Sequence, residues 1–147
     1  MSDDYEEALA IALRRLQASD RFEAEIRKAL ARFSDSTVDR VVVYLRGQRF
    51  LNDERVTARY IEGNVGRRAV GTERLRSRLL AKGAPPEVLE QADTGNDVER
   101  ALSALAGKFR DPSPSDRGRA GRFLFGRGFG EDDVESALAQ YFGEIEP

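Results

Sequence analysis

Apolar residues recur along the chain at the spacing of one face of an α-helix. Leu9, Ala12, Leu13 and Leu16 follow one another at i, i+3, i+4 and i+7. No segment alternates convincingly between apolar and polar residues with a period of two, so the pattern predicts an all-α fold. Further helices are predicted by the apolar residues of the segments 26–30, 38–45, 56–65, 75–80, 89–92, 101–105, 120–125 and 134–141.

Residues with preferred places at helix ends divide these segments. Either Asn52 or Asp53 is expected to cap the helix that follows, and Thr72 the next one. Gly83 suits the left-handed residue that ends a helix, and Pro85 with Pro86 suits the first turn of a short one. The run 41–44, three valines and a tyrosine, would favour a strand on propensity alone, but its flanks offer no hairpin partner, so we predict a helix there.

The apolar pattern repeats with a period of about 45 residues, which is the length of one three-helix unit. Six positions match at identical internal spacing, and a first copy lies upstream, shortened by two residues. We therefore predict three tandem three-helix repeats, at residues 1–52, 53–94 and 95–147, stacked into an elongated, curved array. The matching positions are Leu75, Leu79, Gly83, Ala84, Leu89 and Ala92 against Ala120, Leu124, Gly128, Phe129, Val134 and Ala137, with Ile26, Leu30, Phe33, Val38 and Val41 in the first copy.

Composition excludes several kinds of chemistry. The chain of 147 residues has no cysteine and no histidine, so thiolate nucleophiles, imidazole bases and His or Cys metal ligands are ruled out. We expect neither catalysis nor a bound metal or cofactor. Acidic pairs such as Asp53-Glu54 lie at helix starts, where the helix dipole accounts for them. No apolar run reaches the roughly 20 residues that span a bilayer, and the acidic N-terminus is unlike a signal peptide, so a cytoplasmic location is expected.

Positive charge is concentrated between Val56 and Gly83, although the whole chain carries a net charge of −2. Seven basic residues stand there against Glu62 and Glu73, a net charge of +5. Such a surface suits phosphate or an acidic partner, and a solvated helical face is the alternative reading. Arg67 and Arg68 are the leading candidates, because a turn bounded by glycines exposes both. A second cluster, with a net charge of +4, consists of Lys108, Arg110, Arg117, Arg119, Arg122 and Arg127 against Asp111 and Asp116.

One stretch carries a recognisable family pattern. Phe50-Leu51-Asn52-Asp53, Ala58-Arg59-Tyr60-Ile61, Gly71, Leu75, Leu79 and Lys82-Gly83 resemble the core signature of the RecX family. The segments 22–30 and 122–129 look like that family's first and third repeats. Phe22 stands where the family usually has serine, so the second helix is expected to be capped differently, with Asp20 as the candidate. The first repeat also lacks the Lys-Gly pair.

The resemblance implies a small regulator of RecA that is not an enzyme. Family members bind the RecA–DNA filament and restrain its ATPase, coprotease and strand-exchange activities. We expect a monomer whose partners are RecA and the RecA–single-stranded DNA filament, with weak direct contact with DNA and none with membranes. Acidic residues near both ends, at positions 3–4 and 131–146, would repel naked DNA. The alternative is a stand-alone DNA-binding protein built from helix-turn-helix-like units. The candidate RecA- or DNA-binding residues are Arg59, Tyr60, Arg67, Arg68, Arg74, Arg78, Lys82, Arg119, Arg122 and Arg127.

Overall fold

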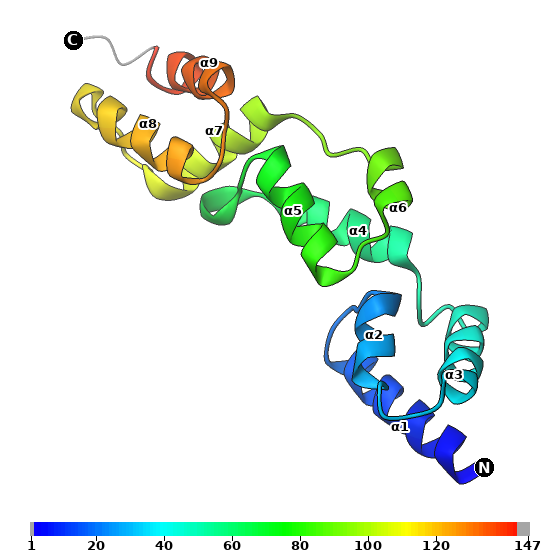
Figure 1. Ribbon diagram of the computed structural model, residues 1–147. Coiled ribbons are helices and arrows are strands. Elements are labelled where there is room, and N and C mark those ends of the chain that lie inside the picture. Colours follow the sequence, from blue (N-terminus) through cyan, green and yellow to red (C-terminus); the bar gives the residue numbers. More distant parts are fainter. Residues whose placement is uncertain (1, 144–147) are drawn as a thin grey trace. The chain divides into compact units, whose positions relative to one another are not determined.

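The structure, a computed structural model, describes the backbone of residues 2–143 and the side chains of residues 4–143. These residues form helices and loops and contain no strand, which confirms the predicted all-α class (Figure 1). Of the acidic residues expected to repel naked DNA, Glu144 and Glu146 lie outside the described residues, as does the side chain of Asp3. The α-helices are α1 Ser2–Ala18, α2 Glu23–Ala29, α3 Asp35–Gly47, α4 Asp53–Glu62, α5 Thr72–Lys82, α6 Pro86–Gln91, α7 Asp97–Lys108, α8 Arg117–Gly126 and α9 Glu131–Phe142, with short 3₁₀ turns η1 Gly66–Arg68 and η2 Pro114–Asp116.

Several predicted helix ends are confirmed. The run 41–44 lies inside α3, so helical packing overrides its strand propensity. Asn52 caps α4 by accepting a hydrogen bond of 3.0 Å from the backbone N–H of Arg55. Gly83 follows α5 with φ of +118°, a conformation that glycine adopts readily, and Pro86 is the first residue of α6.

Two predicted caps are wrong, because in each case the side chain contacts a residue distant in the sequence instead. The carboxylate of Asp20 does not cap α2 but pairs with the guanidinium of Arg59, 2.5 Å away. The start of α2 is closed by Glu25, whose side chain accepts from the N–H of Phe22 at 2.9 Å. Thr72 is the first residue of α5, not its cap, and its hydroxyl donates to Asp97 at 2.8 Å.

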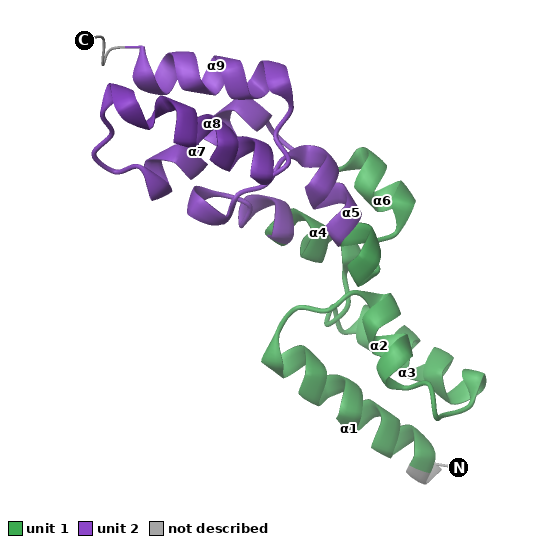
Figure 2. Cartoon of the chain, turned by 60° about the vertical axis from the view of Figure 1, so that its left-hand side comes forward, with its two compact units in different colours: residues 1–59, 79–92 green, residues 60–78, 93–147 purple. Residues whose placement is uncertain are grey.

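The described part of the chain divides into two compact units, coloured separately in Figure 2. Unit 1 comprises residues 1–59 and 79–92. The apolar faces of α1, α2 and α3 enclose its core, which is dominated by aliphatic side chains. The buried core residues are Ala8, Ala12, Ile26, Leu30, Val38, Val41, Val42, Leu45 and Leu51.

Unit 2 comprises residues 60–78 and 93–147. Its core lies among α7, α8, α9 and the chain around η1, and it contains more aromatic residues. The boundary between the units falls within α4 and α5, so the predicted division into three repeats stays a prediction. The buried core residues of unit 2 are Ala69, Ala101, Ala104, Leu105, Phe109, Ala120, Leu124, Phe129, Val134, Ala137 and Phe142.

None of the helices in the described part of the chain is both long enough and apolar enough to cross a membrane.

Candidate partner-binding surface

The turn η1 carries the two leading candidates, Arg67 and Arg68, and its backbone is fixed against α7. Gly66 adopts φ of +71°, and its N–H donates to the Ser103 hydroxyl at 2.6 Å. Gly107 on α7 permits this approach, since a Cβ there would lie only 2.7 Å from the Arg67 nitrogen. The backbone of the turn is therefore held while its side chains stay at the surface.

A buried asparagine closes the loop that contains this turn. The side-chain amide of Asn64 donates to the Val70 carbonyl at 3.0 Å, and its oxygen accepts from the Val70 N–H at 2.9 Å. Asn64 is 7% exposed, so these bonds are shielded from water. A loop held at both ends loses little conformational entropy when a partner binds it.

The side chains of Arg67 and Arg68 are both exposed. Within the described residues, neither guanidinium forms an ion pair or a side-chain hydrogen bond. Arginine presents a planar fork of donors that matches carboxylates and phosphates. Two unpaired forks on a rigid turn can bind an anionic partner without first breaking an internal contact.

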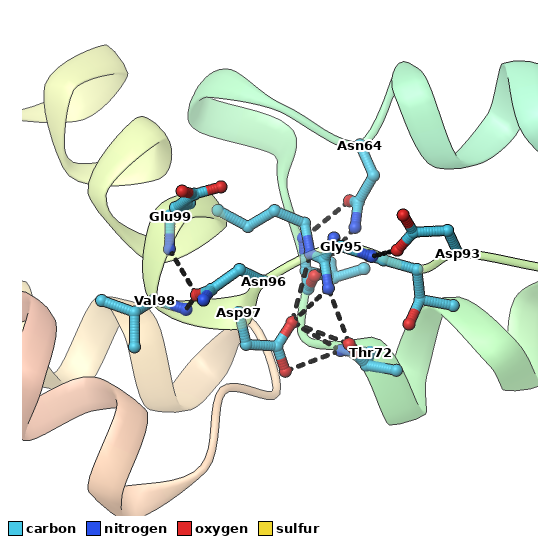
Figure 3. A network of polar contacts seen from close by, with 11 residues as sticks. Asn64, Thr72, Asp93, Gly95, Asn96, Asp97, Val98 and Glu99 are labelled. Carbon is cyan, nitrogen blue, oxygen red and sulfur yellow. Dashed lines mark hydrogen bonds and ion pairs between the residues drawn. The ribbon is translucent and has the colours of Figure 1, made fainter.

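A polar network fixes the start of α5, which carries Arg74 and Arg78 (Figure 3). Both Asp97 carboxylate oxygens accept from the Thr72 N–H, at 3.1 and 3.2 Å. Arg100 pairs with the same carboxylate at 2.6 Å and donates to the Thr72 hydroxyl at 2.7 Å and to the Thr94 carbonyl. Burial alone would raise the pKa of Asp97, but the hydrogen bonds from Thr72 and Arg100 outweigh it and hold that pKa below its ordinary value.

Arg74 is exposed but committed to an internal contact. Its Nη1 donates to the Gly126 carbonyl at 2.5 Å, at the end of α8, where unpaired carbonyls favour a cation. A Cβ added at Gly128 would lie 3.0 Å from the Arg74 Nε, so the guanidinium crosses closely over this glycine. One turn further along α5, Arg78 is exposed and makes no such contact within the described residues.

Most candidates of the second basic cluster lie against aromatic rings of unit 2. Arg119 pairs with Asp116 at 2.6 Å and lies over the Phe109 ring, 5.5 Å from its centre. Arg127 is half-buried over the Phe123 ring at 5.4 Å. Arg122 is exposed and forms no ion pair among the described residues. Arg122 therefore differs from Arg119 and Arg127, the other two candidates of this cluster, which have internal partners.

The remaining candidates differ in their surroundings. Arg59 belongs to unit 1 and is exposed, but its ion pair with Asp20 already occupies it. Tyr60 is half-buried in unit 2. Lys82 is exposed in unit 1, where it lines a groove with residues of α1 and α2. Among the predicted set, the exposed arginines without an internal partner in the described chain are therefore Arg67, Arg68, Arg78 and Arg122.

Comparison with known proteins decides the family. The chain is 37% identical over 124 residues to a protein named Regulatory protein RecX from Thermus thermophilus, and the match covers 84% of each chain. This chain belongs to the RecX family. A second protein of that name, from Leptothrix cholodnii, is 32% identical over 136 residues, covering 86% of this chain and 84% of its own. No family model matches the chain.

The fold agrees with RecX membership. The crystal structure of RecX from Lactobacillus salivarius superimposes with a TM-score of 0.72, covering 99% of this chain and all of the other, at 19% sequence identity. The likeness at that identity concerns the fold. The resemblance inferred from the sequence is therefore confirmed in both sequence and architecture.

Most of the residues that shape this surface were not predicted from the sequence. Asp97, Arg100, Ser103 and Gly107 all lie on α7, a helix predicted only from its apolar face. One signal was present: Asn96-Asp97 repeats Asn52-Asp53 at 44 residues' distance, close to the repeat period. In both pairs the asparagine caps its own helix and the aspartate accepts from the first N–H of an earlier one, Glu23 or Thr72.

Proposed function

We propose that this chain is a regulatory protein that binds RecA, or the RecA–DNA filament, and mainly inhibits its ATPase, coprotease and strand-exchange activities. Its membership of the RecX family carries the proposal, because relatives covering most of the chain bear the name of regulatory proteins. The partner and the inhibited activities follow from what the family resemblance implies.

The rigid turn η1 supports a docking role within this function. A RecA–DNA filament offers carboxylates and phosphates, and both are ligands of the arginine fork. Arg67 and Arg68 are exposed and unpaired among the described residues, and the bonds of Asn64 and Ser103 hold the backbone that carries them. We therefore propose these two arginines as the filament contact, together with Arg78 and Arg122 of the same unit.

The function is tested by titrating this protein into RecA that hydrolyses ATP on single-stranded DNA. The proposal expects the hydrolysis rate to fall as the protein is added. An unchanged rate with the protein in excess over RecA would refute it.

Salt-dependent DNA binding distinguishes the alternative of a stand-alone DNA-binding protein. Proteins that neutralise several phosphates lose affinity steeply as salt rises. A regulator that recognises a protein-coated filament should bind naked DNA weakly, in keeping with the net charge of −2. Tight binding to bare DNA without RecA, with a steep salt slope, would favour the alternative.

A further inference from the structure

Unit 1 contains an open groove of about 730 Å³ that the sequence did not indicate. It is lined by the end of α1, most of α2 with Arg21 just before it, and the end of α5 with the glycine that follows. Each of these segments contributes a basic side chain. Arg15 lies on α1, Lys28 on α2 and Lys82 on α5, and Arg21 lies just before α2. Its volume falls in the range of clefts that bind ligands.

The groove carries an excess of positive charge. Four basic side chains face one carboxylate, that of Glu25, for a net charge of +3. Glu25 is already engaged, because one oxygen accepts from the Phe22 N–H at 2.9 Å and the other lies 3.5 Å from Arg21. Arg15 and Lys28 are exposed and form no ion pair within the described residues. Among the described residues, the buried Nε of Arg21 has no hydrogen-bond partner.

The uncharged residues that line the groove form its floor, and they are aliphatic and mostly small. They are Ala24, Ile26, Ala29, Ala81 and Gly83, and the absence of a side chain at Gly83 lets the turn after α5 approach α2 closely. A Cβ at Gly83 would lie 2.9 Å from the Cβ of Ala24, so no larger residue fits there. Aromatic side chains are absent from the described residues that line the groove. Proteins that hold single-stranded nucleic acid without sequence preference stack its bases on aromatic rings.

We propose that this groove binds an acidic segment of a partner protein. Carboxylates of the segment would meet the guanidinium and ammonium groups at the rim, while an aliphatic side chain would lie on the alanine floor. Charge complementarity favours an anionic occupant, and the aliphatic floor favours a polypeptide over a nucleic-acid strand. The groove lies in unit 1, whereas Arg67 and Arg68 belong to unit 2, so this site is additional to the proposed filament contact.

The test measures fluorescence anisotropy of a labelled peptide rich in glutamate with interspersed leucines, titrated with the whole chain. Arg15→Glu and Lys28→Glu each reverse a charge at the rim, and both side chains are exposed, so folding should be preserved. Arg14→Glu is the matched control: it is exposed, lies next to Arg15 on α1 and does not line the groove. A labelled oligothymidylate and a peptide with glutamine for glutamate serve as the other probes.

The proposal expects the acidic peptide to bind, the glutamine peptide to bind at least about tenfold more weakly, and each rim variant to lose about tenfold in affinity while Arg14→Glu loses little. Absence of peptide binding would overturn it, as would equal losses in Arg14→Glu and Arg15→Glu. Preferential binding of the oligothymidylate, lost in Arg15→Glu, would also overturn it and assign the groove to nucleic acid. RecA inhibition is a separate measurement, so failure here leaves the proposed function standing.

Discussion

Replacing Asp97 with alanine should destabilise unit 2 well beyond the cost of an ordinary helix cap. Asp97 is the ion-pair partner of Arg100, whose side chain is only 8% exposed. Without the carboxylate, the buried guanidinium keeps the Thr72 hydroxyl and the Thr94 carbonyl as acceptors but loses its counter-charge. Breaking a buried pair from one side costs about 3–5 kcal/mol, and because two acceptors remain, the expected loss is about 3 kcal/mol.

Asp53→Ala is the matched comparison, because Asp53 holds the corresponding position in unit 1. It accepts a single hydrogen bond of 2.9 Å, from the N–H of Glu23, and has no buried arginine beside it in the described chain. Losing such a cap costs about 1 kcal/mol. Urea unfolding followed by helical circular dichroism measures both variants, and we expect Asp97→Ala to lose about 2 kcal/mol more than Asp53→Ala.

A double variant shows whether the unpaired charge is the cause. Asp97→Ala combined with Arg100→Met leaves no buried cation and keeps a side chain of similar length. It should be more stable than Asp97→Ala alone by at least about 1 kcal/mol. If the double variant is no more stable, or if Asp97→Ala costs no more than Asp53→Ala, the account of this network is wrong.

The two aspartates should also respond to acid in opposite directions. The depressed pKa of Asp97 means that its stabilising contribution is complete above the ordinary value of about 3.9 and is lost as pH falls through the lower folded value. Burial raises the pKa of Asp53, and the hydrogen bond from Glu23 only partly offsets this. The native state therefore binds the Asp53 proton more tightly, so protonation of Asp53 favours folding. As pH falls, the free energy of unfolding should therefore decrease less in Asp97→Asn than in the unmodified protein. In Asp53→Asn it should decrease more.

Three further substitutions test the parts that hold the turn and the core of unit 2. Gly107→Val should displace η1, because its Cβ would meet the Arg67 nitrogen at 2.7 Å; amide exchange at Gly66 should rise, whereas Gly126→Val, with open space around its Cβ, should leave it unchanged. Asn64→Ala removes both bonds to Val70 and should cost about 2 kcal/mol in urea unfolding; unchanged amide exchange at Val70 would contradict this. Tyr141→Phe removes the bond to the Phe109 carbonyl and should cost about 1 kcal/mol at neutral pH. Because burial raises the pKa of the Tyr141 phenol, this variant should also lose less stability above about pH 10, and an unchanged alkaline profile would count against that assignment.

Hydrophobic spacing predicted the helices because it reports on local packing. The run 41–44 shows why periodicity outweighs propensity: Val41 and Val42 are buried, while Val43 and Tyr44 face outward, as one face of a helix requires. Gly83 was also predictable, since a glycine after an apolar run commonly takes a left-handed conformation.

Contacts between distant residues account for what the sequence missed. Thr72 has the chemistry of a cap, but whether its hydroxyl caps its own helix or binds elsewhere depends on Asp97, 25 residues away. Likewise Arg74 looked like a surface cation until the structure placed it against Gly126, 52 residues away. The groove cations Arg15 and Lys28 gave no signal, because they belong to different helices and no local charge run joins them.

Docking of RecA through the turn η1 is tested most directly by measuring how strongly a variant with reversed charge at this turn inhibits ATP hydrolysis by RecA. Arg67→Glu with Arg68→Glu should weaken inhibition at least about tenfold while helical content is unchanged. The matched control is Arg14→Glu with Arg49→Glu, which makes the same change of net charge at exposed arginines of unit 1. We predict that this control inhibits like the unmodified protein. Full inhibition by the Arg67 and Arg68 variant, or an equal loss in the control, would contradict docking through the turn.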